Sequence, residues 1–242
     1  MIRVHSYESM GTYDGPGLRL VVFLQGCNFK CLYCANPDTL PLDGGEATTP
    51  QKIVQMALNQ KPFFGKRGGI TFSGGEPTLQ AAALIPLFRE LKQKGIHICL
   101  DTNGSIRTQE AEELFRLSDL ILLDVKEFNE TRHRTLTGRS NSPTLATASW
   151  LEAQGKPMWL RYVLVPGYSD FTEDMEALCQ HFKDFRMVER LEILPYHTFG
   201  VHKYAALGQP YPLEGVKENT SEQIEAAREL FARHFPVVRV NR

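Results

Sequence analysis

The sequence lacks the features that would tie it to a membrane, to a disulfide scaffold or to nucleic acid. Its longest apolar runs, such as residues 18–24 and 120–125, are too short to span a bilayer, and its first residues lack the layout of a signal peptide. Charge of one sign is not in excess, because 27 Lys and Arg residues stand against 28 Asp and Glu residues. Five cysteines are an odd number and do not make a disulfide framework. We therefore expect a cytoplasmic protein without a membrane or nucleic-acid partner.

The 242 residues fit one large domain, residues 1–242, in which apolar runs alternate with helical patterns. Strands are expected at 18–24, 69–72, 96–100, 120–123, 158–165 and 191–194. Helices are expected at 50–60, 78–94, 108–117, 143–154 and 221–234, the first capped by Thr49 before Pro50 and the last by a Thr220–Gln223 capping box. Repeated strand–helix units indicate an α/β fold with a parallel sheet, and six of them favour a partial (β/α)6 barrel of the TIM type.

Three of the five cysteines lie in the loop of residues 25–36, with the spacing Cys27-x3-Cys31-x2-Cys34. Thiolates are the soft ligands that bind zinc, copper(I) or iron–sulfur clusters. A structural zinc site and an ordinary cubane cluster each use four protein ligands, so three cysteines leave one metal position open for chemistry. A zinc loop and three buried thiols remain alternatives at this point.

Polar or glycine-rich residues follow the expected strands, where the active site of a parallel barrel is assembled. They are Cys27 to Cys34 after the first strand, Gly74, Gly75 and Glu76 after the second, Asp101 and Thr102 after the third, Asp124 and Lys126 after the fourth, and His197 after the sixth, while Arg161 lies within the fifth. Each of them alone has an ordinary structural explanation. Their recurrence at successive strand ends indicates one site.

The cysteine loop, with the aromatic Tyr33 directly before its last cysteine, resembles the radical S-adenosylmethionine (SAM) superfamily. The resemblance implies a [4Fe-4S] cluster held by Cys27, Cys31 and Cys34, whose fourth iron is chelated by SAM. In that superfamily the reduced cluster cleaves SAM to a 5'-deoxyadenosyl radical. Residues 73–77, Ser-Gly-Gly-Glu-Pro, resemble its glycine-rich SAM-binding motif.

The same resemblance implies a set of SAM contacts. They are Tyr33, Ala35, Gly74, Gly75, Glu76, Asp124, Lys126, Arg161 and His197. Gly74 and Gly75 allow backbone to approach the ligand closely. Lys126 is expected to neutralise the SAM carboxylate, Asp101 and Asp124 to balance its positive charges or hold a cation, and His197 to contact the adenosine. A structural ion pair between Asp124 and Lys126 remains the alternative.

Short motifs along nearly the whole chain resemble the pyruvate formate-lyase activating enzyme family. They lie at residues 5–9, 11–17, 23–27, 31–34, 99–104, 123–126, 161–167 and 194–197. The resemblance implies that the chain abstracts a hydrogen from a glycine of pyruvate formate-lyase, in anaerobic glucose metabolism, with flavodoxin or a similar protein as electron donor. It also implies a monovalent cation beside SAM, held by Asp101, Thr102, Leu122 and Asp124. The chain has no ferredoxin-like insert, which favours the short, formate-lyase type.

Two residues depart from this family. Ala35 stands where the best-known members have histidine, and Met10 replaces a frequent cysteine. The alternatives are therefore another glycyl radical enzyme as partner, a small-molecule substrate, or a zinc-binding interaction protein.

The glycine-rich loop of residues 11–17 is expected to fold back over the site, where Asp14 would hydrogen-bond the incoming peptide. A plain connecting turn is the alternative.

Overall fold

The computed structural model describes residues 1–241, which divide into two compact units. The first unit contains Met1–Asn28 and Thr39–Leu122, and the second contains Phe29–Asp38 and the chain from Leu123 onward. The boundary therefore passes through the cysteine loop, with Cys27 in the first unit and Cys31 and Cys34 in the second.

The first unit is built on five strands in the order β3 (Glu46–Thr48), β1 (Ile2–Gly11), β2 (Arg19–Leu24), β4 (Gly69–Gly74) and β5 (His97–Thr102). Strand β1 pairs antiparallel with β2 and β3, whereas β2, β4 and β5 run parallel, with Arg19 opposite Gly69 and Gly69 opposite His97. Helices α1 (Pro50–Phe64), α2 (Ala81–Gln93) and α3 (Gln109–Leu117) and the 3-10 turn η2 (Pro77–Gln80) belong to this unit.

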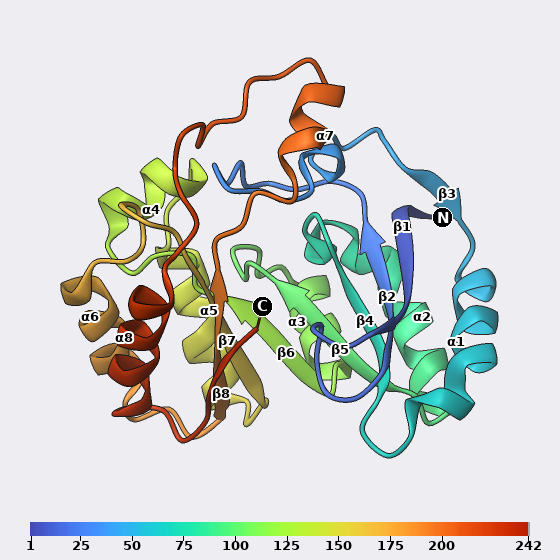
Figure 1. The fold of residues 1–242 in the computed structure, drawn as a ribbon. Coiled ribbons are helices and arrows are strands. Elements are labelled where there is room, and N and C mark those ends of the chain that lie inside the picture. Colours follow the sequence, from blue (N-terminus) through green and yellow to red (C-terminus); the bar gives the residue numbers. More distant parts are fainter. Residues whose placement is uncertain (242) are drawn as a thin grey trace. The chain divides into compact units, whose positions relative to one another are not determined.

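Side-chain alternation decides which face of these strands the helices cover. Leu20, Val22, Ile70 and Phe72 are fully buried, and the Phe72 ring lies 4.6 Å from that of Phe88 on α2. In Figure 1, α1 and α2 lie along the same side of β2 and β4. The opposite face of β4 and β5 carries Thr71, Ser73, Cys99 and Asp101, since alternate residues of a strand share a face. Chemistry-bearing side chains therefore gather on the face that α1 and α2 leave.

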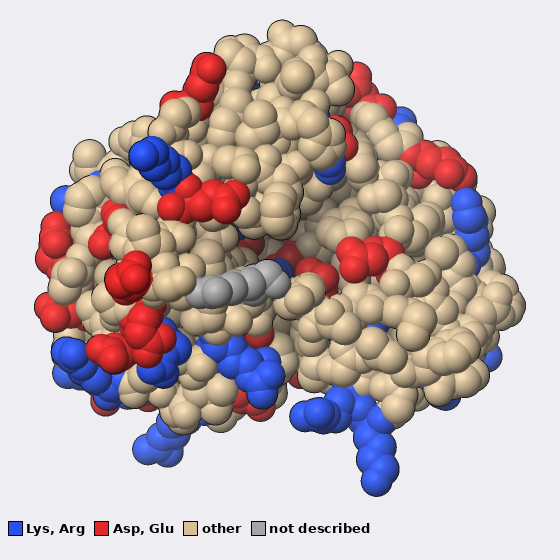
Figure 2. All heavy atoms as spheres, viewed as in Figure 1, with Lys and Arg blue, Asp and Glu red and all other residues tan. Residues whose placement is uncertain are grey.

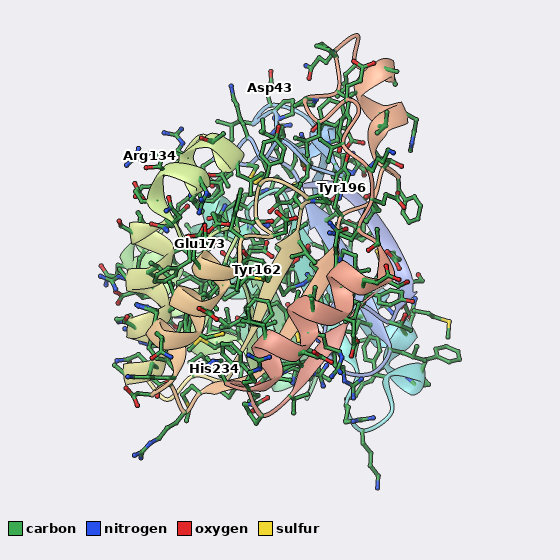
Figure 3. The ribbon with its side chains drawn as sticks, turned by 60° about the vertical axis from the view of Figure 1, so that its left-hand side comes forward. Asp43, Arg134, Tyr162, Glu173, Tyr196 and His234 are labelled. Carbon is green, nitrogen blue, oxygen red and sulfur yellow. The ribbon has the colours of Figure 1, made fainter. Side chains whose placement is uncertain are left out.

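The second unit contains the parallel strands β7 (Met158–Leu164), β8 (Val188–Pro195) and β9 (Val238–Val240). Its helices are α4 (Glu130–Thr137), α5 (Ser142–Ala153), α6 (Thr172–Phe182), α7 (Val201–Ala206) and α8 (Ser221–Ala232). Helix α8 begins with the predicted capping box of Thr220 and Gln223, and its Phe231 packs on Tyr162 of β7 with ring centroids 5.4 Å apart. Figure 3 shows Tyr162 on β7, with Tyr196 beyond the end of β8. Strand β6 (Leu120–Asp124) and the 3-10 turn η1 (Pro37–Thr39) cross the sequence boundary between the units.

The parallel α/β fold expected from the sequence is confirmed, and each of the six expected strands is present. Six elements were missed: β1, β3, α4, α6, α7 and β9. The expected helix at 78–94 is divided into η2 and α2, with Pro86 inside α2. Among residues 1–241 there is no helix that combines the length and the apolar character needed to cross a membrane. Acidic and basic side chains are mixed on the face that Figure 2 shows.

Candidate functional site

The first cysteine of the loop is fixed through backbone hydrogen bonds in the first unit. The Gly26 amide donates to the carbonyl of Thr39 at 2.7 Å, and the Cys27 amide donates to that of Leu40 at 3.2 Å. From the other side, the amide of Glu76 donates to the carbonyl of Gly26 at 2.7 Å. The backbone that carries Cys27 is therefore held between the segment after η1 and the turn after β4.

Gly75 is a glycine because two backbones meet at it. A Cβ built on Gly75 would lie 2.0 Å from the carbonyl oxygen of Gly26, and its own amide donates to the carbonyl of Leu24 at 2.9 Å. The sequence led us to expect that the missing side chain makes room for SAM. The structure shows that it makes room for the cysteine loop. Gly74 has φ of +102°, a conformation that favours glycine, and its Cβ would lie 2.4 Å from the Leu24 nitrogen.

The Glu76 carboxylate, expected to contact SAM, accepts four hydrogen bonds from the protein. Its Oε1 accepts from the Thr78 amide at 3.0 Å and from the hydroxyls of Thr78 and Thr102, each at 2.6 Å, and its Oε2 accepts from the Asn103 amide at 2.8 Å. Burial raises the pKa of this fully buried carboxyl group, while the hydrogen bonds from Thr102, Thr78 and Asn103 act to lower it. Glu76 thus joins the turn after β4 to the turn after β5.

Asn28, directly after the first cysteine, is clasped by the same turn after β5. Its Oδ1 accepts from Nδ2 of Asn103 at 3.0 Å, and its Nδ2 donates to the hydroxyl of Ser105 at 2.7 Å. The Ser105 amide in turn donates to Oδ1 of Asn103 at 2.9 Å. These contacts continue the Glu76 network to the residue beside Cys27.

Asp101 and Thr102, the two side chains of this unit proposed to hold a cation, are both engaged. The hydroxyl of Ser73 donates to Oδ2 of Asp101 at 2.6 Å. The hydroxyl of Thr102 donates to Glu76 and accepts from the Gly104 amide at 3.0 Å. The two strand ends are therefore tied side to side as well as through Glu76.

In the second unit, the segment between the first two cysteines lies on helix α4. The Lys30 amide donates to the carbonyl of Thr137 at 3.0 Å, and the Leu32 amide donates to that of Leu136 at 2.9 Å. The Phe29 ring meets that of His133 edge-on, with centroids 5.8 Å apart. The carbonyls at the end of an α-helix lack partners within the helix, so the end of α4 is suited to receive these amides.

Tyr33, Asp124 and Lys126 form a buried cluster in this unit. Nζ of Lys126 lies 2.6 Å from Oδ2 of Asp124 and 5.7 Å from the centroid of the Tyr33 ring. Burial acts to lower the pKa of Lys126, but Asp124, Tyr33 and Cys31 outweigh it and raise that pKa well above its usual value. The Tyr33 hydroxyl is buried and meets no hydrogen-bond partner among residues 1–241. The ion pair considered from the sequence is therefore present, and Lys126 is a charged ammonium group.

Helix α7 lies on the segment that follows the third cysteine. Nζ of Lys203 donates to Oδ1 of Asn36 at 2.6 Å and lies 3.4 Å from Asp38. A Cβ built on Gly200 would lie 2.7 Å from the Cα of Ala35. Burial raises the pKa of the Cys34 thiol, whereas the Asn36 amide, Lys126 and Lys203 act to lower it. Two ammonium groups therefore favour the thiolate form that a metal would bind.

Arg161 and His197, the remaining expected SAM contacts, differ in exposure. Arg161 is buried on β7, with its Nε 3.9 Å from Oε2 of Glu192 on β8. His197 is exposed beyond β8, and its ring stacks on that of Phe199 at a centroid distance of 4.6 Å. Glu192 also accepts from Nη1 of Arg190 at 3.2 Å, so it lies between two guanidinium groups.

The five cysteines fall into two groups. Cys27, Cys31 and Cys34 are free and partly accessible, whereas Cys99 and Cys179 are buried. Burial raises the pKa of Cys99 to about 12 and that of Cys179 to about 12, so both remain neutral thiols. Three accessible thiols with lysines beside the last of them fit an anionic thiolate cluster. Within the described chain, no three His, Cys, Asp or Glu side chains surround a point that a single metal ion could occupy; in a cubane cluster each thiolate binds a different iron.

Several structural residues of the site were missed in the sequence analysis. They are Asn28, Asn103, Ser105, Gly200, Lys203 and Glu192. Asn103 was the most accessible of these, because it follows Asp101 and Thr102 directly at a strand end. Lys203 and Gly200 had no such signal, since they lie far along the chain from the cysteines that they support.

Comparison with known proteins gives consistent matches over most of the chain. Residues 21–181 match the radical SAM superfamily. The chain is 48% identical over 235 residues to the pyruvate formate-lyase-activating enzyme of Streptococcus mutans, covering 94% of this chain and 89% of that protein. It is 42% identical over 229 residues to the pyruvate formate-lyase 1-activating enzyme of Escherichia coli K12, covering 93% of each.

Solved structures show the same fold at lower sequence identity. A domain of a pyruvate-formate lyase-activating enzyme from Bacteroides vulgatus superposes with a TM-score of 0.61 at 23% identity, over 72% of this chain and 99% of that one. Streptococcus suis SuiB bound to S-adenosylmethionine superposes with a TM-score of 0.71 at 14% identity, over 93% of this chain and 51% of that one. At these identities the structural likeness bears on the fold alone.

Proposed function

The chain belongs to the radical SAM superfamily and, within it, to the family of pyruvate formate-lyase-activating enzymes, and we propose that it generates the glycyl radical of a pyruvate formate-lyase. The observation that carries this proposal is the identity of 42–48% over about 93% of the chain. As a member of this superfamily the chain uses a [4Fe-4S] cluster and SAM. We propose that both units form one radical SAM domain, since the superfamily match includes residues of both.

We propose that Cys27, Cys31 and Cys34 are the protein ligands of the cluster. Their accessibility, and the two ammonium groups that act on Cys34, support this assignment over Cys99 and Cys179. When bound, the cluster supplies one electron for the reductive cleavage of SAM. The residues of the chain hold the loop in place: the turn after β4 supports the backbone at Cys27, and α4 and α7 support the segment with Cys31 and Cys34.

For SAM, we propose that Lys126 binds the carboxylate and that Tyr33, Ala35, Arg161 and His197 contribute further contacts. Lys126 is already paired with Asp124 at 2.6 Å, so a ligand carboxylate would compete with Asp124 for the ammonium group. A monovalent cation bound by Asp124, together with Asp101, Thr102 and the Leu122 carbonyl, would relieve that competition, because the cation would take over the charge of Asp124. The cation and Lys126 would thus act on SAM together.

Gly75 and Glu76 take a different part in this proposal. Both are engaged with the protein backbone, so we assign them to positioning the cysteine loop and the turn after β5. Gly74, at the end of β4, remains a candidate for backbone contact with SAM.

The proposed macromolecular partners are a pyruvate formate-lyase, which supplies a glycine-containing loop, and flavodoxin or a similar electron donor. A cytoplasmic location fits this proposal, because thiolate-ligated clusters need a reducing compartment. For hydrogen abstraction, the reacting glycine must be held close to the SAM-derived radical, so the lyase loop must enter the site as an extended segment.

The test is anaerobic reconstitution with iron and sulfide, followed by electron paramagnetic resonance with SAM, a reductant and the pyruvate formate-lyase of the same host. We expect an organic radical on the lyase that depends on all three additions. The matched control is Cys31→Ser, which should give neither cluster nor radical. Bound zinc without iron would contradict the radical SAM assignment, and 5'-deoxyadenosine without a lyase radical would contradict the proposed substrate.

A further inference from the structure

Arg19, at the start of β2, is fully buried on the face of the sheet that carries Thr71 and Cys99. Its Nε donates to the Thr71 hydroxyl at 2.5 Å, its Nη1 to the carbonyl of Pro16 at 2.9 Å, and its Nη2 to the carbonyl of Ile70 at 2.6 Å. Burying a guanidinium among neutral acceptors costs free energy, since desolvation is not repaid by a close carboxylate. A smaller apolar residue would serve a plain strand better, so the arrangement calls for a role in the loop that Arg19 holds.

Thr71 connects Arg19 to the glycine-rich loop. Its hydroxyl accepts from Arg19 and donates to the backbone carbonyl of Asp14 at 2.6 Å. The loop is therefore held at Asp14 through Thr71 and at Pro16 by Arg19 directly. Because Thr71 is buried and its hydroxyl has both roles, both connections depend on this one oxygen.

The glycines of the loop fit it closely against the strands. Gly15, at φ of +122°, would place a Cβ 2.9 Å from Sγ of Cys99 and 3.1 Å from Cδ of Arg19. Gly17, at φ of +72°, would place one 2.5 Å from the Gly68 nitrogen. The loop is thus packed in a fixed conformation, and it is more than the connecting turn that the sequence left as an alternative.

The loop lies on the face of the sheet that carries the polar strand ends. Thr71 and Ser73 are two residues apart on β4, and Cys99 and Asp101 are two apart on β5, so all four share one face. Thr71 pairs with Cys99 in the parallel register, and Ser73 donates to Asp101 at 2.6 Å. The backbone of Asp14 is therefore fixed one side-chain layer from the Ser73–Asp101 contact. Thr12 and Tyr13 remain exposed on the outer side of the loop.

We propose that Arg19 and Thr71 are positioning residues for the substrate peptide, holding the Asp14–Gly17 backbone as a preformed surface for an extended, glycine-containing segment of the partner protein. This inference rests on the proposed function. An ordered loop lowers the entropy cost of docking, because the peptide meets main-chain groups already in place. Arg19 and Thr71 touch neither the peptide nor SAM in this proposal and act through the loop alone.

The decisive pair of variants is Thr71→Val and Thr71→Ser. Valine matches threonine in shape but removes the hydroxyl, whereas serine keeps the hydroxyl. With a synthetic peptide of the lyase's glycine loop as substrate, we expect Thr71→Val to raise the peptide KM roughly tenfold, with kcat at saturating peptide near that of the unaltered chain. Thr71→Ser should stay within about twofold. The matched control is Thr147→Val, which changes a fully buried threonine on α5, in the second unit.

Hydrogen exchange provides a second measurement that does not depend on activity. In Thr71→Val, the amides of residues 12–17 should exchange faster while those of β4 and β5 keep their protection. An unchanged peptide KM, an equal rise in Thr71→Ser, or unaltered exchange in the loop would overturn the inference. The proposed function is scored separately, by SAM cleavage in the unaltered chain without peptide, and its failure would leave the exchange result standing.

Discussion

Substitution of Gly75 by alanine tests whether this glycine supports the cysteine loop or the ligand. The added Cβ would lie 2.0 Å from the carbonyl oxygen of Gly26, in the residue before Cys27. The obstacle is backbone, which cannot rotate away as a flexible side chain would. Relief of the contact requires the two segments to separate by more than about 1 Å.

The cost follows from two terms. Overpacking of a close contact costs about 1–3 kcal/mol. Separation also breaks the hydrogen bond from the Glu76 amide to Gly26, now 2.7 Å long, which contributes about 1 kcal/mol net. The sum, about 2–4 kcal/mol, corresponds to a fall in Tm of about 5–15 °C for a chain of this size.

The assay is thermal unfolding of the apoprotein, together with iron content after anaerobic reconstitution. We expect Gly75→Ala to lower both, because the displaced Gly26 carries Cys27 with it. The control is Gly155→Ala, where a Cβ meets nothing within 4 Å and only the φ of +63° is unfavourable; this strain costs about 1–2 kcal/mol. Normal iron content and Tm in Gly75→Ala, with weakened SAM binding alone, would refute the reasoning and return Gly75 to the ligand.

Three further predictions concern the cysteines, the pH dependence of stability and the peptide. Cys31→Ser should abolish iron binding, whereas Cys99→Ala should keep it, since Cys99 is a buried neutral thiol; equal loss of iron in both would exclude the three-ligand assignment. Burial raises the pKa of Glu127 from 4.5 to about 7, so between these values the folded chain holds the extra proton and the free energy of unfolding falls as the pH rises, by up to about 3 kcal/mol. In urea unfolding from pH 4.5 to 8, Glu127→Gln should remove this fall, and parallel curves for both proteins would contradict the argument. Asp14→Ala should keep reductive SAM cleavage without lyase but lower the glycyl radical yield and weaken binding of a glycine-loop peptide; a normal yield would separate Asp14 from substrate binding.

The parts of the fold that could be predicted are those with local signals. Helix α8 was placed by its capping box, and β2 by an apolar run directly before the cysteines. Strand β1 was missed because its burial does not alternate strictly and its neighbouring glycines drew attention to the loop. Helix α4 was missed because few of its residues are apolar; it is held by its Asn129 cap and by its contacts with the segment at Lys30 and Leu32.

The site was predictable in its residue types and less so in their partners. The glycines after β4 indicated a close backbone approach, but only the structure shows that Gly75 approaches Gly26. Glu76 was expected to contact the ligand because it follows those glycines, yet Thr78, Thr102 and the Asn103 amide occupy its oxygens. Hydrogen bonds between turns of different strands depend on tertiary packing, which a single sequence does not encode locally.

The contact of α7 with the cysteine segment has a consequence for the order in which the chain folds. Lys203 meets Asn36 across 167 positions of sequence, and Gly200 lies against Ala35. During synthesis the chain emerges from its N-terminus at about 5–20 residues per second, so the cysteines precede α7 by roughly ten seconds or more. A contact that closes so long a loop also forms late in folding, since loop closure costs entropy before the contact repays it. The newly made thiols therefore pass through an interval in which Ala35 and Asn36 are still uncovered, and their final surroundings are completed by one of the last parts of the chain to appear.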